Sequence, residues 1–290
     1  MMTRRRFMET VAAAGVAAGS IGLFKPSRTT ATPHAVKDDI SLAQWALVEE
    51  IQAGKWKTLD FAKVARQDFG ISGIEYVNTL FENPTAGYLA QLKQNVADQG
   101  VTSVLIMVDD EGETCTPDKA ERKQTVINHQ KWIDIAHYLG CHAIRTNCRG
   151  KQGDDPQEAL KWSADTYQQM LEYAIPANIS ILIENHGGFS NDADWMAALF
   201  KLVNSLYFGS YPDWRSPSKE FDNYAYIQKM LPWAGGLSYR NQPDEETTKK
   251  LIELCYNSGY RGWYGIESSG RDAIRQGKEL LTKHLLSKYK

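Results

Sequence analysis

Cysteine is scarce in this sequence, which has four in a chain of 290 residues. None of them forms a CxxC pair, and no group of cysteine and histidine has the spacing of a zinc site. Only Cys141 and Cys148 lie close in sequence, and they would flank a predicted strand. We therefore favour free buried thiols over a disulfide for the four, which are Cys115, Cys141, Cys148 and Cys255.

Clustered positive charge and a phosphate-binding loop are also lacking. The formal net charge is −2, and no run of lysine and arginine occurs outside the N-terminus. A nucleic-acid-binding protein needs such a basic surface, so we expect no nucleic-acid partner. The segment AQWALVEEIQAG, at the first predicted strand, contains no GxGxxG loop, which argues against a doubly wound nucleotide-binding sheet.

The N-terminal segment differs from the rest of the chain. TRRRFM, at residues 3–8, precedes an apolar stretch over 11–24 and a polar spacer. It resembles a twin-arginine export signal, although Met8 and Glu9 replace the usual Leu and Lys. The apolar stretch is too short for an ordinary membrane span. We expect residues 1–35 to be signal and spacer, the export machinery to be a partner, and the mature protein to be periplasmic, without a stable membrane span.

From residue 40 onward, short β-rich runs alternate with longer helical patterns, and no linker rich in Pro, Gly or Ser interrupts them. The longest predicted helix covers 118–139, where Trp132, Ile133, Ala136 and Leu139 form an apolar stripe. Eight strands separated by helices predict an α/β fold, a single-domain (β/α)₈ TIM barrel over residues 36–290. The predicted strands are 41–47, 73–78, 102–108, 142–147, 179–185, 207–212, 235–239 and 261–267.

In such a barrel the residues that end the strands face a common mouth. Glu184, Asp213 and Glu267 each end a predicted strand. Three converging carboxylates would repel one another, and a divalent cation would neutralise them. The alternative is pairing with arginine side chains or exposure to solvent. Arginines available for such pairing are Arg145, Arg149, Arg215 and Arg240.

Several segments resemble the sugar phosphate isomerase/epimerase family, the xylose isomerase-like barrels. They are ISLAQWAL, TLDFAKVARQDFGISGIEYVN, LGCHAIRTNCRG, ILIENHGGFSNDADW, FGSYPDW and GYRGWYGIESSG. The resemblance implies a divalent ion (Mn, Mg, Co or Zn) held by Glu184, Asp213 and Glu267. It places a fourth ligand, a histidine, at Ser238. This departure predicts weaker metal binding, a preference for oxygen-liking ions, or recruitment of His186.

The resemblance also implies a mechanism. Glu184 and Glu267 would exchange a proton on opposite sides of a carbon next to a carbonyl, with the metal polarising that carbonyl. His186, two residues after Glu184, is a further catalytic candidate on the same strand face. We expect a sugar isomerase or epimerase. The alternatives are a keto-sugar (3-keto-glycoside) lyase or hydratase and an exported sugar-binding barrel without catalysis.

The expected substrate is a carbohydrate, because aromatic side chains near the strand ends offer faces on which sugar rings stack. Trp214, beside Asp213, is the strongest candidate for such a contact. An arginine pair would suit a phosphate or carboxylate, but export favours an uncharged sugar. The predicted substrate-binding residues are Trp45, Glu75, Asn147, Arg149, Trp214, Ser238 and Arg240.

Overall fold

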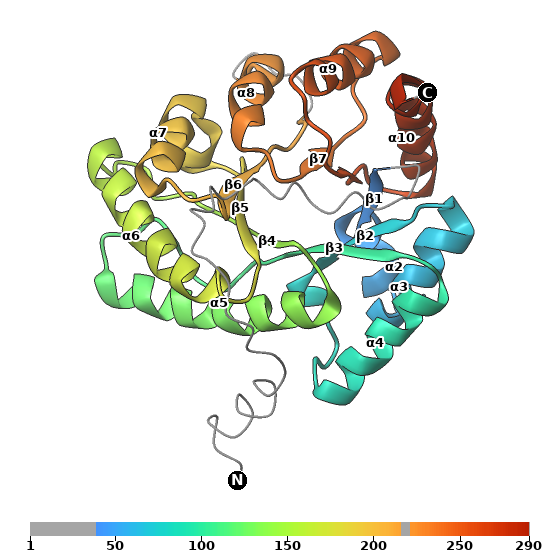
Figure 1. The fold of residues 1–290 in the computed structure, drawn as a ribbon, viewed down its shortest axis with the longest axis horizontal. Coiled ribbons are helices and arrows are strands. Elements are labelled where there is room, and N and C mark those ends of the chain that lie inside the picture. The colour runs from blue at the N-terminus through green and yellow to red at the C-terminus, as the bar shows by residue number, and fades with distance from the viewer. Residues whose placement is uncertain (1–38, 216–220, 290) are drawn as a thin grey trace, which may run out of the picture. The chain divides into compact units, whose positions relative to one another are not determined.

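The computed structural model describes residues 39–215 and 221–289, so the predicted export signal lies outside the described residues. All eight predicted strands are present, and all are parallel (Figure 1). The fold prediction, a (β/α)₈ barrel, is confirmed. The strands are β1 (Ile40–Ala43), β2 (Gly73–Val77), β3 (Thr102–Met107), β4 (Ala143–Thr146), β5 (Ser180–Glu184), β6 (Phe208–Tyr211), β7 (Leu237–Tyr239) and β8 (Tyr264–Ile266).

The strands follow the order β6-β5-β4-β3-β2-β1-β8-β7. Between the two ends of this order, β6 and β7, the ring is joined by isolated bridges that pair Ser210 with Ala234 and Asp213 with Ser238. We call this junction the seam. Elsewhere continuous ladders connect neighbouring strands, so the seam is the least regular part of the ring.

Helices lie outside the strands as a ring (Figure 1). The predicted helix over 118–139 begins at Lys119, because Asp118 accepts hydrogen bonds from the first free amides, and it ends at Gly140 with φ 81°. The α-helices are α2 (Val48–Gln52), α3 (Phe61–Lys63), α4 (Ala86–Asp98), α5 (Lys119–Leu139), α6 (Pro156–Ala174), α7 (Ala193–Val203), α8 (Asn223–Met230), α9 (Glu245–Asn257) and α10 (Arg271–His284).

Short turns of other helix types complete the chain. The predicted first strand is shortened, since its second half is a 3₁₀ turn rather than extended backbone. The short elements are η1 (Gln44–Leu47), η2 (Thr58–Asp60), η3 (Val64–Asp68, a π-helix), η4 (Asn78–Leu80), η5 (Gly188–Asn191), η6 (Leu231–Trp233) and η7 (Leu286–Tyr289).

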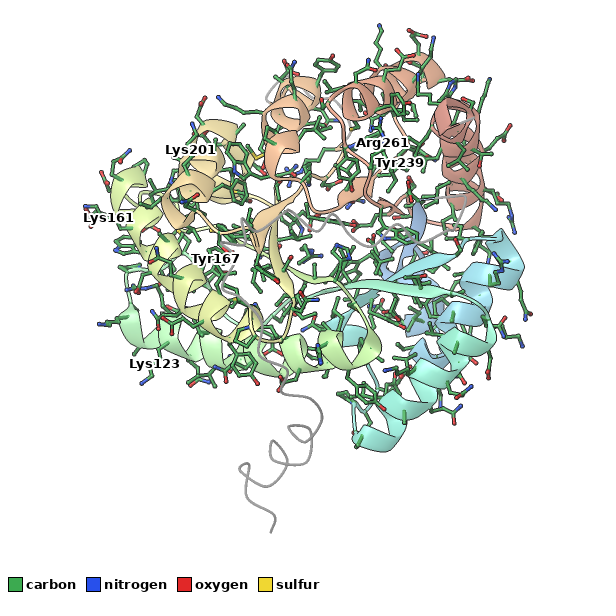
Figure 2. All side chains as sticks on the ribbon, viewed as in Figure 1. Lys123, Lys161, Tyr167, Lys201, Tyr239 and Arg261 are labelled. Carbon is green, nitrogen blue, oxygen red and sulfur yellow. The ribbon has the colours of Figure 1, made fainter. Side chains whose placement is uncertain are left out.

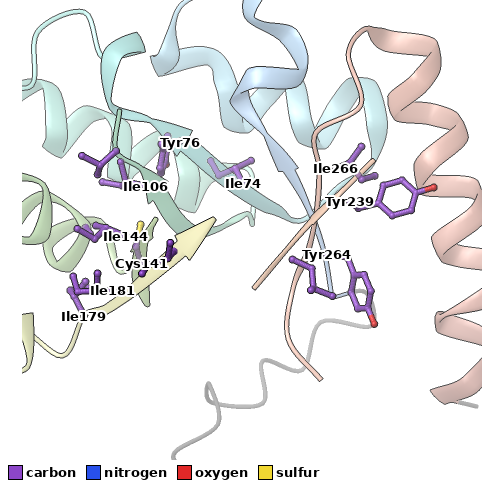
Figure 3. Close-up of a cluster of buried hydrophobic side chains, with 14 of the residues drawn as sticks. Ile74, Tyr76, Ile106, Cys141, Ile144, Ile179, Ile181, Tyr239, Tyr264 and Ile266 are labelled. Carbon is purple, nitrogen blue, oxygen red and sulfur yellow. The ribbon is translucent and has the colours of Figure 1, made fainter. Parts of the chain in front are cut away.

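Apolar side chains fill both sides of the strand ring. Outward-facing residues such as Ile74 and Tyr76 of β2 and Ile144 of β4 pack in the cluster drawn in Figure 3. Inward-facing residues form a smaller second cluster that includes Leu105 and Tyr211. This alternation is the two-residue period of a β-strand, and it sets which side chains reach the barrel interior.

The outer helices carry exposed lysine side chains. The labelled lysines Lys123, Lys161 and Lys201 are on the outer helices, whereas Tyr167 of α6 is buried against the strands (Figure 2). All four cysteines are buried free thiols, which confirms the expectation for them. No helix among the described residues is long and apolar enough to cross a membrane.

Candidate active site

The carboxyl ends of the strands surround a cavity of about 730 Å³. Backbone hydrogen bonding of the parallel ladder ends at this rim, so polar side chains just beyond each strand are free to turn inward. The strand-end residues that line it are Asp109, Arg145, Asn147, Arg149, Glu184, His186, Arg240 and Glu267, and Trp45 of η1 joins them.

One side of the rim is organised by Arg145 of β4. Its Nη1 lies 2.6 Å from Oδ1 of Asp109, and its Nε lies 2.9 Å from Oε2 of Glu184. One buried guanidinium of β4 thus bridges two carboxylates that come from the strands on either side of it, β3 and β5. The contact with Glu184 lacks hydrogen-bond geometry, since neither Nε of Arg145 nor Oε2 of Glu184 has a hydrogen-bond partner among the described residues.

The other side is organised by Arg240, which directly follows β7. Its Nε donates to Oδ1 of Asp213 at 2.8 Å, and its Nη2 lies 3.0 Å from Oε1 of Glu267. The hydroxyl of Ser238 donates to Oε2 of Glu267 at 2.6 Å. A second arginine therefore also bridges two carboxylates, and both oxygens of Glu267 are engaged.

A hydrogen-bonded chain connects the first side to the cavity wall. Asn147 donates to Oδ1 of Asp109 at 2.6 Å, and its Oδ1 lies 2.9 Å from Nδ1 of His186. Nη2 of Arg149 lies 3.0 Å from the same ring nitrogen. Trp45 donates its indole N–H to Asp109 at 3.2 Å. These contacts fix the orientation of the polar side chains that face the cavity.

The electrostatic environment differs from group to group. Burial raises the pKa of Glu184 to about 8, against the lowering effect of Arg145. Burial likewise raises the pKa of Asp213 to about 6. Desolvation of the ring, with the nearby charges of Arg145 and Arg149, lowers the pKa of His186 to about 4. Near neutral pH the Glu184 carboxyl keeps a proton and the His186 ring is uncharged.

The structure places Glu184 and Glu267 on the wall of one cavity, and Asp213 contacts Arg240, which lines the same cavity. Arg145 pairs Glu184 with Asp109, and Arg240 pairs Asp213 with Glu267. It also places Trp45, Asn147, Arg149 and Arg240 on the cavity wall, together with His186. Their roles in binding or catalysis stay predictions.

Three predicted substrate contacts, Trp214, Glu75 and Ser238, do not line the cavity. The Trp214 ring is fully buried and packs on Tyr239 and Tyr264, at centroid distances of 5.2 and 6.0 Å. Neighbouring residues along an extended segment point to opposite sides, so Trp214 turns away from the side that Asp213 faces. This position corrects the prediction that Trp214 contacts the sugar.

Glu75 is also fully buried, inside the barrel. It accepts hydrogen bonds from Ser41, at 2.7 Å, and from Tyr211. Glu75 does not line the cavity. The prediction that it contacts a substrate is therefore corrected, because Glu75 lies beneath the site. Ser238 is buried as well and reaches the site only through Glu267.

Sequence reasoning undervalued Asp109 and Arg145. Asp109 follows a strand, and that position was a usable signal. Arg145 was one of the arginines available for pairing with a strand-end carboxylate, but nothing in the sequence indicates that its guanidinium would contact two carboxylates at once.

The geometry agrees with the family comparison. The model of the xylose isomerase-like TIM barrel family matches residues 62–229, more than half of the chain. The chain belongs to this family. No curated protein matches the sequence.

Solved structures share the barrel of this xylose isomerase-like chain. A D-tagatose 3-epimerase-like protein has a TM-score of 0.70 at 17% identity, over 86% of this chain and 98% of its own. The 3-keto-D-glucoside 4-epimerase from E. coli has a TM-score of 0.65 at 12% identity, over 87% and 99%. A xylose isomerase-like TIM barrel protein from Mycobacterium smegmatis, in complex with magnesium, has a TM-score of 0.64 at 15% identity, over 86% and 96%. At such identities the likeness shows the fold.

The side chains of this xylose isomerase-like barrel do not, as arranged, fit a divalent ion. Such an ion needs several converging ligand atoms. Here Glu184, Asp213 and Glu267 each contact a guanidinium, and the Ser238 hydroxyl donates a hydrogen bond to Glu267. Within residues 39–215 and 221–289, no group of three or more His, Cys, Asp or Glu side chains could hold a metal ion.

Proposed function

We propose that this chain is an enzyme that moves a proton next to the carbonyl of a carbohydrate, as a sugar isomerase or epimerase. The observation that carries the proposal is a pair of glutamates that line one cavity. Glu184 is the last residue of β5, and Glu267 directly follows β8. A C–H bond beside a carbonyl is weakly acidic, and a carboxylate within reach acts as a general base. Two such groups allow one to remove a proton and the other to deliver one.

The surroundings of the two glutamates favour different roles. Glu184, with its pKa raised to about 8, holds a proton at neutral pH and suits the general acid. Glu267 accepts a hydrogen bond from the Ser238 hydroxyl and pairs with the Arg240 guanidinium. Both contacts favour its ionised form, which suits the general base. His186, uncharged at this pH, lines the same cavity and suits a hydrogen bond to a substrate hydroxyl.

The charge of the cavity wall supports an uncharged carbohydrate as substrate. Seven acidic side chains and three arginines line it. An anionic sugar phosphate would meet this excess of negative charge, whereas hydroxyl groups find both donors and acceptors. Trp45, held by Asp109, supplies an aromatic surface on the wall.

The test is exchange of hydrogen in deuterium oxide. Ketoses and 3-keto-glycosides are incubated with the protein, and NMR follows deuterium at the carbon beside the carbonyl. We expect exchange in the wild type and a fall of about 10²–10⁴-fold in Glu267→Gln, the usual contribution of a general base. We expect Glu184→Gln to lose epimer formation. Glu158→Gln, an exposed site on α6, is the matched control and should exchange normally.

Other outcomes would replace this proposal. Formation of a carbon–carbon double bond with loss of a leaving group would indicate a keto-sugar lyase or hydratase. Sugar binding in calorimetry without any exchange would indicate a sugar-binding barrel without catalysis.

Export is a separate part of the proposal, supported by the sequence of residues 3–24 alone. Replacing Arg4 and Arg5 by lysine should leave the protein in the cytoplasmic fraction, whereas the wild type should appear in the periplasmic fraction. Wild-type protein confined to the cytoplasm would contradict export.

A further inference from the structure

Arg240 lies between the carboxylates for which a divalent ion was predicted. Its guanidinium contacts Asp213 through Nε, at 2.8 Å, and Glu267 through Nη2, at 3.0 Å. On the opposite side, Arg145 contacts Glu184 at 2.9 Å. Two guanidinium groups carry the same charge as one divalent ion. The Asp213 and Glu267 carboxylates are therefore neutralised in part by Arg240, and Glu184 lies against a second guanidinium.

Ser238, two residues before Arg240 in sequence, supports the same conclusion independently. Ser238, where the resemblance places a histidine ligand, donates its hydroxyl hydrogen to Oε2 of Glu267 at 2.6 Å. A neutral hydroxyl that donates in this way offers poor support to a cation, whereas imidazole nitrogen is a common ligand. The change of residue and the inserted guanidinium both remove features of a metal site.

Arg240 also has donors to spare. A guanidinium carries five N–H groups. Three of them face Asp213, Oε1 of Glu267 and, at 3.3 Å, the carbonyl oxygen of Glu267. Two N–H groups remain without a partner among the described residues. The side chain is 33% exposed and lines the cavity, so these donors are open to a bound molecule.

We propose that the Arg240 guanidinium acts in place of a metal ion, binding the carbonyl oxygen of the substrate and the negative oxygen that forms when the proton is removed. This inference deepens the proposed function and rests on it for the catalytic step. Its consequence for metal binding does not depend on that function.

The charges balance throughout the step. Glu267 takes the proton from carbon, the electron pair of the broken C–H bond forms the carbon–carbon double bond, and the carbonyl electrons move onto oxygen. One negative charge thus passes from the Glu267 carboxylate to the substrate oxygen. Arg240 contacts the first and faces the second, so it stays paired while the charge moves. Preorganised donors of this kind stabilise the developing oxyanion.

The first experiment measures metal binding by titration calorimetry with MnCl₂ alone. We expect no binding at the site in the wild type. Arg240→Ala, and more strongly Arg240→Ala with Ser238→His, should bind Mn²⁺ at least about tenfold tighter than the weakest binding that the titration detects, since removing a nearby cation lowers Coulomb repulsion. Arg275→Ala is the matched control, because Arg275 is an exposed arginine on α10 that contacts Asp272 and does not line the cavity, and it should behave as the wild type.

Two results would overturn the inference. One is a wild-type protein that binds one Mn²⁺ per chain and loses it in Asp213→Asn. The other is a failure of both Arg240 variants to bind Mn²⁺, because Arg240 would then not occupy the position of the cation. Circular dichroism checks folding, and Arg240→Gln, which retains a donor for Asp213, replaces any variant that does not fold.

The second experiment tests the catalytic part. Deuterium exchange by the wild type should persist after dialysis against EDTA, and Arg240→Lys should reduce it, because lysine keeps the charge but not the planar pair of donors. Loss of exchange in EDTA, restored by Mn²⁺, would overturn the role of Arg240. If no sugar exchanges in the wild type, the proposed function fails, while the Mn²⁺ titrations still decide the placement of Arg240.

Discussion

Arg145 and Arg240 make the same kind of contact in two different settings. Each guanidinium bridges two carboxylates at the rim of the barrel. The Arg145 side chain is 1% exposed, whereas that of Arg240 is 33% exposed and faces the cavity. The difference shows that two arginines lining one cavity can differ widely in their access to water. Arg145 holds the strand ends together, and Arg240 has donors left for a ligand.

Removing each arginine tests this comparison most directly. Arg145→Met leaves Asp109 and Glu184 without their cation in a buried position, and we expect it to lose about 3–5 kcal/mol of unfolding free energy. Arg240→Met should lose about 1 kcal/mol, since water can solvate the carboxylates once the side chain is shortened. Urea unfolding of both variants measures the two losses. Equal losses would remove the distinction between a structural and a ligand-facing arginine.

Glu75 is a buried carboxyl group that accepts hydrogen bonds from the hydroxyl groups of Ser41 and Tyr211, whereas Glu267 contacts an arginine. Burial raises its pKa from 4.5 to about 7. Between these values the native protein binds more protons than the unfolded chain, so this group makes the native state less stable as the pH rises from about 4.5 to about 7. Glu75→Gln removes the titration.

We therefore expect the stability of Glu75→Gln relative to the wild type to increase over that interval by about 3 kcal/mol, and then to stay constant. Urea unfolding at a series of pH values measures this difference. A difference independent of pH would show that Glu75 is ionised in the native state as readily as in the unfolded chain.

Arg149 is the exposed arginine of the rim and should give the smallest effect. It contributes to the lowered pKa of His186, which is about 4. Arg149→Ala should raise that pKa, because a positive charge beside the ring is removed, but burial and Arg145 keep it below 6.5. NMR titration of the ring protons measures the change. An unchanged pKa would mean that the charge of Arg149 does not affect the protonation of His186.

The barrel was predictable because its determinants are local. Strands such as β5 show as short apolar runs, and α5 begins at Asp118 and ends at Gly140, which are both ordinary cap residues. The boundaries were less predictable. The first strand stops at Ala43, where the chain turns into η1, and apolar content alone does not distinguish these conformations.

The site was predictable in its strand-end carboxylates and less so in their partners. Glu184 and Glu267 follow from their position at the ends of strands. The directions in which the Trp214 and Glu75 side chains point depend on the register and tilt of the strands. These determine whether a side chain faces the cavity or is buried inside the barrel. Whether a metal ion or a guanidinium neutralises the carboxylates depends on where the Arg240 side chain lies. That position is set by contacts between strands distant in sequence.

The seam between β6 and β7 has fewer paired backbone residues than the other strand pairs around the site. Asp213 and Ser238 pair across it, with Trp214 donating its backbone N–H to the Ser238 carbonyl at 2.9 Å and Ser238 donating to Pro212 at 3.0 Å. Amide hydrogens held by so short a ladder exchange with solvent through local opening more readily than those of a continuous sheet. Arg240 joins Asp213 on one side of the seam to Glu267 on the other. A molecule held by Arg240 would therefore slow the local opening of the seam and the exchange of its amide hydrogens. Occupancy of the cavity is thereby linked to the closure of the ring itself.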